Sequence, residues 1–379
     1  MDPWLWLEWF LKALIMSFIL LTGFAYLTLY ERRALARIQT RVGPNRAGPQ
    51  GLLQPIADAV KLIFKEELTP SAADKILFVA APIMTVVPAM LLTAVIPLGT
   101  QFILPFTERV ITLRVAEINV GVLYLTAIAS ISVYGIVLAG WASNNKYAML
   151  GGMRSTAQMI SYELALGMCF VVAILLANSM DLIEIVNAQQ SMWFAVLQPV
   201  GALVFMVTTL AEVNRAPFDM PEAEQELAAG YHSEYSGMKF ALFFMAEYEK
   251  MIVISMIAAT LYFGGYREFW FLKDTAFSVD HFWWLGPIYL LAKVVVLLFF
   301  MIWIRATWPR IRYDRLMAFG WKVLLPLSIA VVVITAFGIL LADQLGSTYI
   351  WSIPVLSILA GAIMAFFLNQ SLRRKVAHA

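Results

Sequence analysis

Long apolar runs separated by short polar segments make up most of this chain. Uncharged runs of about 18 residues or more recur, the length that a helix needs to cross about 30 Å of hydrocarbon. Helices satisfy their own backbone hydrogen bonds there, whereas an open sheet cannot, so the runs are predicted to be helices. We expect nine spans, at residues 10–30, 76–98, 116–140, 160–178, 192–212, 240–264, 282–304, 322–342 and 350–368.

A shorter periodic segment follows the first predicted span. Residues 41–51 are rich in Gly and Pro and are predicted to form turns. Over residues 52–66, apolar side chains recur at spacings of three and four, with Asp58 and Lys61 off that stripe. The pattern predicts an amphipathic helix of about 14 residues lying in the membrane interface. A helix packed on a soluble neighbour is the alternative. The segment 41–67 is expected to be ordered on either interpretation.

Composition supports an all-α polytopic membrane protein formed as a single transmembrane domain over residues 1–379. The chain is 61% hydrophobic and 14% charged, with a mean hydropathy of +0.77. Its one Cys excludes a disulfide within the chain and thiolate-ligated clusters, and three scattered His do not form a convincing metal or haem site. Any electron carrier is therefore expected outside this chain. The net charge of +2 gives no indication of nucleic-acid binding.

The placement of Lys and Arg predicts the orientation. Most of these residues lie between the first and second predicted spans, between residues 305 and 322, and at the C-terminus, all on one side of the membrane. The other side carries far fewer: Lys12, Arg109, Arg114, Arg267 and Lys273. The positive-inside rule places the N-terminus outside and the C-terminus in the cytoplasm.

Two inside loops mix charged side chains with groups that pack. The acidic loop, residues 211–239, also contains Phe218 and Met220, and the basic loop, residues 305–322, also contains Trp308 and Tyr313. Such mixing favours packed segments that face each other across a polar chamber. An ordinary acidic surface loop and a purely topogenic basic loop are the alternatives. The charged residues of the acidic loop are Glu212, Arg215, Asp219, Glu222, Glu224, Glu226, Glu234 and Lys239.

Charges within the predicted spans are costly unless they are paired or hydrated. Glu117 opens the third span, Glu163 lies early in the fourth, Glu247 lies about two turns into the sixth, and Lys293 lies near the middle of the seventh. Several charges on separate helices favour a buried proton relay. A static ion pair between Glu247 and Lys250, at i and i+3, is the alternative.

Five motifs, in order, resemble the membrane H subunit family (also called subunit 1) of respiratory complex I. They begin at residues 31, 41, 161, 211 and 305, and read ERR, RVGPNRAGPQGLLQPIADAVKLIFKE, SYELALG, AEVNRAPFDMPEAEQELAAGYHSEYSGMKFALFFMAEY and RATWPRIRYDRLMAFGWKVLLP. The ninth span departs from the eight that many members have. Glu249 and Lys250 also make the sixth span more charged than is usual in the family.

The resemblance implies the membrane subunit of a proton-pumping NADH:quinone oxidoreductase in the cell inner membrane. Its substrate would be a quinone, and NADH, FMN and iron–sulfur clusters would belong to partner subunits. The implied partners are peripheral-arm quinone-site subunits, small and antiporter-like membrane subunits, and lipid. By similarity, the quinone tunnel would be lined by Glu31, Arg32, Arg41, Asp58, Arg310 and Arg312. The acidic loop would couple this tunnel to a buried relay of Glu117, Glu163, Glu247 and Lys293.

Two other functions remain open from the residues. The chain could be the equivalent subunit of a membrane-bound hydrogenase or a related dehydrogenase, which the EAEQEL and RYDRLM motifs disfavour. A stand-alone ion transporter using intramembrane carboxylates would be supported by an inverted internal repeat. The acidic and basic loops have no counterpart in the other half of the chain, which disfavours that interpretation.

Overall fold

The computed structural model of the chain describes residues 3–103, 110–220, 229–269, 272, 277–279 and 281–377. Within them the regular structure is helical, apart from two paired antiparallel strands, β1 (Phe102–Ile103) and β2 (Val110–Ile111). The predicted all-α class is confirmed. The α-helices are α1 (Pro3–Ile38), α2 (Gln54–Ile63), α3 (Lys75–Leu91), α4 (Gly121–Ala142), α5 (Lys146–Ala177), α6 (Leu182–Ala188), α7 (Phe194–Leu197), α8 (Pro199–Glu212), α10 (Gly237–Tyr262), α11 (Leu285–Thr307), α12 (Tyr313–Phe319), α13 (Leu325–Leu345) and α14 (Ser352–Ala377).

Short helical turns extend several of these helices. The described turns are η1 (Pro49–Gly51), η2 (Leu92–Val95), η3 (Gly230–His232), η6 (Ser347–Trp351) and a π-helical turn, η5 (Gly320–Leu324), which joins α12 to α13.

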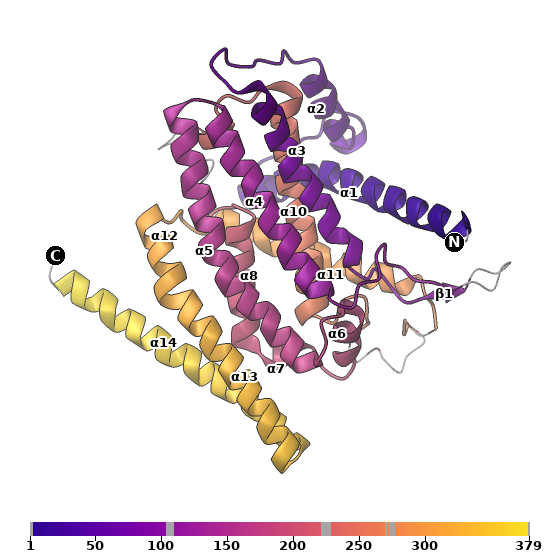
Figure 1. Ribbon diagram of the computed structural model, residues 1–379, viewed down its shortest axis with the longest axis vertical. Helices are drawn as coiled ribbons and strands as arrows, with labels where there is room; N and C mark the ends of the chain where they lie inside the picture. Colours follow the sequence, from indigo (N-terminus) through magenta and orange to yellow (C-terminus); the bar gives the residue numbers. More distant parts are fainter. Residues whose placement is uncertain are drawn as a thin grey trace.

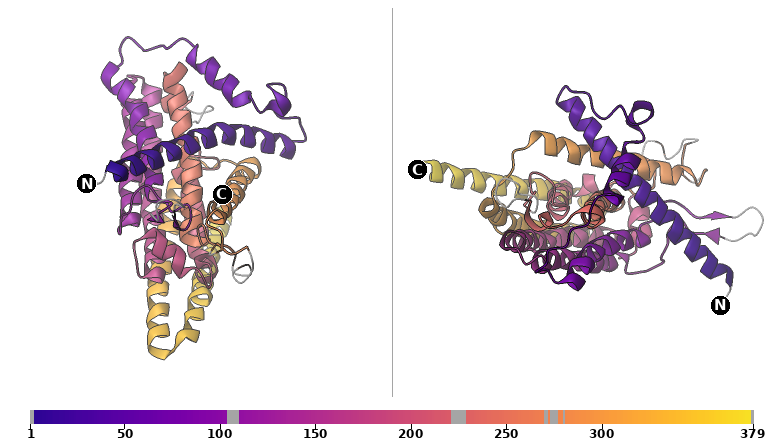
Figure 2. Two further views of the ribbon diagram at one scale, coloured as in Figure 1. Left: turned by 90° about the vertical axis from the view of Figure 1, so that its right-hand side faces the viewer. Right: turned by 90° about the horizontal axis from the view of Figure 1, so that it is seen from above.

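The core of the molecule is a bundle of roughly parallel helices that includes α3, α4, α5, α8 and α10 (Figure 1). The helix α1 crosses this bundle at a steep angle to α3 and α10 (Figure 2). Phe205 of α8 and Tyr262 of α10 are fully buried against each other, and the Tyr262 hydroxyl donates to the carbonyl oxygen of Cys169 of α5. A Cβ at Gly135 of α4 would lie 2.4 Å from Thr85 Cγ2, so the absent side chain allows α3 and α4 to approach closely.

All nine predicted spans fall on helices. Seven described helical segments are long and apolar enough to cross a membrane. Two predicted spans differ from the rest: α8 has 14 residues, or about 21 Å of helix, and α10 carries Glu247, Glu249 and Lys250. The fifth predicted span is interrupted between α7 and α8 at Gln198. The number of membrane crossings and their orientation stay predictions.

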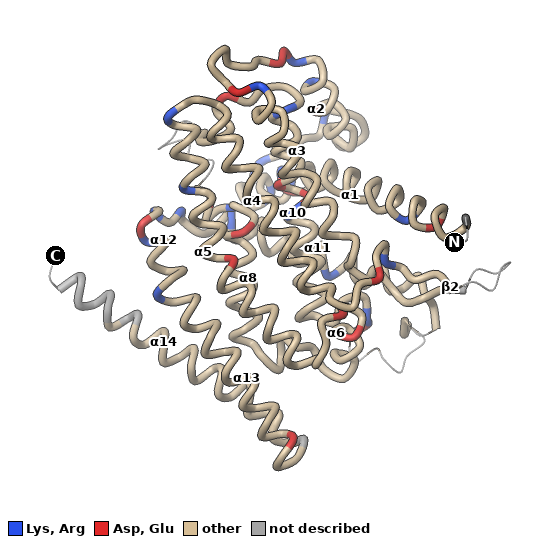
Figure 3. The backbone as a smooth tube through the Cα atoms, in the orientation of Figure 1, with Lys and Arg blue, Asp and Glu red and all other residues tan. Residues whose placement is uncertain are grey.

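The predicted amphipathic helix forms as α2, ten residues long. Its apolar side chains Ile56, Val60 and Phe64 are exposed, and charged residues gather at the end of the bundle where α2 lies (Figure 3). The turn before it needs glycine, because Gly51 has φ of 78° and a Cβ there would lie 2.4 Å from the carbonyl oxygen of Pro44. These features fit the interfacial helix that the sequence predicts.

A C-terminal helical hairpin of α13 and α14 packs beside α8 (Figure 1). Its two helices approach at Gly338, where a Cβ would lie 2.2 Å from Ile353 Cγ1. The ninth predicted helix is therefore present, and it covers part of the short helix α8.

Candidate functional site

The first part of the acidic loop is packed into the bundle. Gln158 of α5 donates hydrogen bonds from Nε2 to the carbonyl oxygens of Ala211 (2.9 Å) and Phe218 (2.8 Å). Phe218 and Met220 are each 2% exposed. An ordinary surface loop is therefore excluded for residues 211–220. Glu222, Glu224 and Glu226 lie outside the described residues.

A buried ion cluster lies directly behind this part of the loop. Arg215 is 4% exposed, with Nη1 3.5 Å from Glu31 Oε1 of α1 and Nε 2.9 Å from Glu247 Oε1 of α10. Arg305 of α11 makes a second ion pair with Glu31, and the ring of Tyr248 lies 4.2 Å from the Arg215 guanidinium. Burial opposes the charge on Arg215, but Glu247 and Glu31 outweigh it and raise the pKa of the guanidinium.

A second buried polar group continues from this cluster into the bundle. Glu212 is 4% exposed and Lys250 is 7% exposed. Glu163 of α5 accepts a hydrogen bond from Ser130 of α4. The charges of Lys250 and Glu163 both act on Glu212. The structure thus brings Glu163, Glu212 and Glu247, which lie far apart in sequence, into one polar region.

The acidic and basic loops meet, as the sequence predicts. Arg310 donates a hydrogen bond to the carbonyl oxygen of Asp219, and the backbone N–H of Ile311 donates to the carbonyl oxygen of Pro217 at 3.3 Å. The far end of the acidic loop is also held, because Glu234 accepts a hydrogen bond from Asn145 at 2.6 Å. Both ends of the loop are therefore fixed on the bundle.

The residues predicted to line a quinone tunnel are only partly brought together. Arg32 of α1 pairs with Asp58 of α2 at 2.7 Å, and Glu31 next to Arg32 is buried in the ion cluster. Arg41 hydrogen-bonds with its near neighbour Gln39 at 2.8 Å, and the side chain of Arg312 is exposed before α12. The structure shows no contact of Arg41 or Arg312 with the buried cluster among the described residues.

Comparison with known proteins identifies the family. Residues 11–336 match the family described as NADH dehydrogenase. The chain belongs to the NADH dehydrogenase family. It is 48% identical over 330 residues to the first H subunit of NADH-quinone oxidoreductase from Geobacter metallireducens, covering 87% of this chain and 96% of that one. It is also 48% identical to the H subunits of the same enzyme from Thermomicrobium roseum, covering 84% and 92%, and from Rickettsia typhi, covering 89% and 95%. The resemblance to the H subunit family is confirmed.

Two residues of the predicted relay lie elsewhere in this NADH dehydrogenase family member. Glu117 was expected in a buried position, but its side chain is 57% exposed and lies 3.9 Å from Arg114, in the segment before α4. Lys293 donates hydrogen bonds to the carbonyl oxygens of Gly265 (2.9 Å) and Arg267 (2.7 Å), beyond the C-terminal end of α10. Neither joins Glu163, Glu212 and Glu247.

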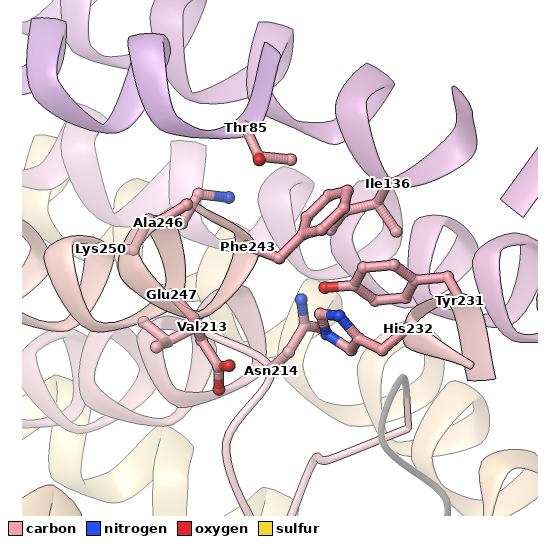
Figure 4. Close-up of a pocket in the computed structure, with 10 residues that line it drawn as sticks. All are labelled: Thr85, Ile136, Val213, Asn214, Tyr231, His232, Phe243, Ala246, Glu247 and Lys250. Carbon is pink, nitrogen blue, oxygen red and sulfur yellow. The ribbon is translucent and has the colours of Figure 1, made fainter. Parts of the chain in front are cut away.

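The static pair considered between Glu247 and Lys250 is not formed. The salt bridge that is resolved for Glu247 is with Arg215. Figure 4 shows the Glu247 carboxylate and the Lys250 ammonium group pointing in opposite directions from α10. The local i, i+3 spacing was therefore a misleading guide to the partner of Glu247.

Sequence reasoning missed several residues that build this site. Arg305 was assigned only to the basic loop, and the roles of Gln158 and Tyr248 were not predicted. The sequence held no clear signal for Gln158, because it lies among other polar residues, including Ser155, Thr156 and Ser161, just before the fourth predicted span. No described group of three His, Cys, Asp or Glu side chains could hold a metal ion.

The buried His232 makes the stability of the folded chain depend on pH. The side chain is buried against Tyr231 and Phe243, Nδ1 has no hydrogen-bond partner among the described residues, and burial lowers the pKa of the imidazole to about 3. The unfolded chain binds a proton there near pH 6.5, so below that pH it holds a proton that the folded chain lacks. Stability therefore falls as the pH drops from about 6.5 toward 3, by about 1.4 kcal/mol at about pH 5.5.

We expect His232→Asn to remove this part of the acid sensitivity. The thermal midpoint of the detergent-solubilised protein is measured near pH 7.5 and near pH 5.5. The fall between the two pH values is expected to be smaller in His232→Asn than in the parent. His281→Asn, at an exposed position, serves as the control and is expected to match the parent. An equal fall in all three proteins would contradict this account of His232.

Proposed function

We propose that the chain is the membrane subunit of a proton-translocating NADH:quinone oxidoreductase. In this role it forms the membrane part of the quinone tunnel and links quinone reduction to proton transfer. The observation that carries the proposal is the buried cluster in which Arg215 meets Glu31, Glu247 and, through Glu31, Arg305. The relatives, which are named as H subunits of NADH-quinone oxidoreductases, support the reaction class.

The quinone would approach from the lipid beside α1 and α2. Exposed apolar side chains on α2, including Ile56 and Phe64, suit an apolar tail, and the Arg32–Asp58 pair ties α2 to α1. The polar head would then lie near the inner ends of α1 and α11 and the two loops. Hydrogen-bond donors available in that region include Arg41, Arg305, Arg310 and Arg312.

The ion cluster offers a physical link between quinone charge and the membrane interior. Two electrons placed on a quinone create negative charge until two protons follow. Negative charge near Arg215 competes with Glu247 for the guanidinium, and a carboxylate that loses its arginine partner binds a proton more readily. Glu247, Glu212 and Glu163 would then pass the proton on toward partner subunits. The acidic side chains of residues 211–239, including Glu222, Glu224 and Glu226, complete the coupling loop in this proposal.

This role also implies where the chain lies in the cell and which partners it contacts. It is a multi-pass protein of the cell inner membrane, with its N-terminus outside and its C-terminus in the cytoplasm. Peripheral-arm quinone-site subunits dock on the acidic and basic loops, and small and antiporter-like membrane subunits receive the protons. NADH, FMN and the iron–sulfur clusters are held by partners, and this chain contacts quinone and lipid.

Glu163→Gln tests the coupling part of the proposal. The amide keeps the shape of the carboxyl group but cannot bind and release a proton. We expect an assembled complex that oxidises NADH with an artificial acceptor at the parental rate and loses quinone-driven proton translocation. Both are measured in native membrane vesicles, the second with a pH-sensitive dye.

Glu268→Gln is the matched control. Glu268 is also buried, at 6% exposure, but it accepts hydrogen bonds from Ser278 and Val279 beyond the C-terminal end of α10. It is expected to translocate protons like the parent. Unchanged translocation in Glu163→Gln would refute the relay. A parent complex with no NADH-dependent activity would favour a hydrogenase or another dehydrogenase.

A further inference from the structure

Lys250 lies between two buried cavities of the bundle. Within the described residues, it is the one side chain that lines both of them. It belongs to α10, is 7% exposed and follows Glu247 by about one helical turn, or about 4.5 Å along the axis. Neither the sequence motifs nor the coupling proposed above assigns it a role.

The first cavity lies on the loop side of Lys250. It measures about 20 Å³ and is lined by residues that include Glu247, Asn214, His232 and Thr85 (Figure 4). A site of this size holds about one water molecule when two or more polar groups surround it. Glu247 of the ion cluster and Lys250 both line this cavity, on different sides of α10.

The second cavity lies farther along α10, toward the middle of the bundle. It measures about 40 Å³, and Glu163, Glu212, Ser132 and Thr209 supply polar groups to a largely apolar lining. A water molecule there can contact carboxylates from both α5 and α8. The two cavities thus place Glu247 on one side of Lys250 and Glu212 with Glu163 on the other.

The ammonium group of Lys250 forms no salt bridge with the described residues. Within the described part of the chain no direct ion pair with Glu247, Glu212 or Glu163 is formed, although the charges of all three act on it. A lysine ammonium group carries three donors, and its amine form accepts a proton. A lysine that faces two cavities without a fixed partner is suited to exchange protons with either.

We propose that Lys250 carries the proton between the two cavities. One N–H bond of the ammonium group breaks as the proton passes, through cavity water, to the carboxylate of Glu212 or Glu163. The neutral amine then takes a proton delivered through the first cavity from Glu247, and the ammonium group is restored. No oxidant or reductant takes part. This inference rests on the proposed coupling function and adds a lysine to a path otherwise made of carboxylates.

The alternative role for Lys250 is a fixed counter-charge for the surrounding carboxylates, and Lys250→Arg separates the two. Arginine keeps the positive charge but does not release its proton in proteins. We expect the assembled Lys250→Arg complex to reduce quinone and to lose proton translocation. Lys250→His, which can bind and release a proton, is expected to retain part of the translocation that Lys250→Arg loses. Translocation is measured per NADH oxidised in membrane vesicles.

Glu249→Gln is the matched control, because Glu249 is buried next to Lys250 but lines neither cavity. It is expected to behave like the parent. Parental translocation in Lys250→Arg, or a Lys250→His complex no better than Lys250→Arg, overturns the proposal. If Glu163→Gln loses translocation and Lys250→Arg keeps it, the role of Lys250 is refuted but the carboxylate relay is not. Parental translocation in both refutes the proposed relay as well.

Discussion

Replacing Arg215 by methionine is expected to destabilise the folded protein by about 3–5 kcal/mol, the usual cost of breaking a buried ion pair from one side. Methionine fills much of the same space but leaves Glu247 without its partner at 2.9 Å, and it leaves Arg305 as the resolved cationic partner of Glu31. Glu247 would then lose this charge compensation, and Glu31 would keep one of its two arginine partners. We expect little of this variant to enter the assembled complex, as measured by native gel electrophoresis of solubilised membranes.

A double variant and an exposed pair provide the controls. Arg215→Met with Glu247→Gln removes both charges of the closest pair and is expected to recover part of the assembled complex, since coupled residues are not additive. Arg32→Met breaks the pair with Asp58, in which the arginine side chain is 47% exposed, and is expected to cost about 0–1 kcal/mol. Equal assembly of Arg215→Met and Arg32→Met would refute the central role given to Arg215.

The helices could be predicted because a bilayer restricts the possible structures. A long uncharged run in lipid has to satisfy its backbone internally, and every predicted span indeed falls on a helix. The break between α7 and α8 could not be predicted in this way. It occurs at Gln198, whose buried side-chain amide donates to Thr335 Oγ1 of α13 at 2.7 Å. That partner is distant in sequence, so hydropathy of the local segment carries no information about it.

The packed part of the candidate site could be predicted because apolar residues occur within the acidic loop. Phe218 and Met220 among acidic residues correctly indicated a packed loop. Charges were harder to interpret, because a hydropathy pattern locates a residue along a span but not the side chain that it meets. Glu117 and Lys293 therefore appeared to belong to the relay, while the structure pairs Glu117 with Arg114 and Lys293 with backbone carbonyl groups after α10. The link between Arg215 and Glu247 required the three-dimensional arrangement of loop and helix.

Replacing Gln158 by leucine is expected to uncouple the acidic loop from the bundle. Leucine has a similar size but cannot donate to the carbonyl oxygens of Ala211 and Phe218. Each carbonyl oxygen keeps a second donor, which is the backbone N–H of Asn214 for Ala211 and that of Met220 for Phe218. A lost hydrogen bond of this kind costs about 0.5–1.5 kcal/mol, so we expect about 1–3 kcal/mol of lost stability for the two together. The loop that carries Arg215 and Asp219 would then no longer be held in place. Quinone reduction per assembled complex is expected to fall sharply, while NADH oxidation with an artificial acceptor is unchanged.

Gln198→Leu separates this local effect from general destabilisation. Gln198 is also a fully buried amide that donates to Thr335 Oγ1, but it lies at the α7–α8 junction, at the opposite end of α8 from the acidic loop. We expect Gln198→Leu to lower the thermal midpoint about as much as Gln158→Leu while leaving quinone reduction per assembled complex near the parental rate. Equal loss of quinone reduction in both variants would mean that it follows stability alone. Parental quinone reduction in Gln158→Leu would mean that the reaction does not depend on holding this loop against α5.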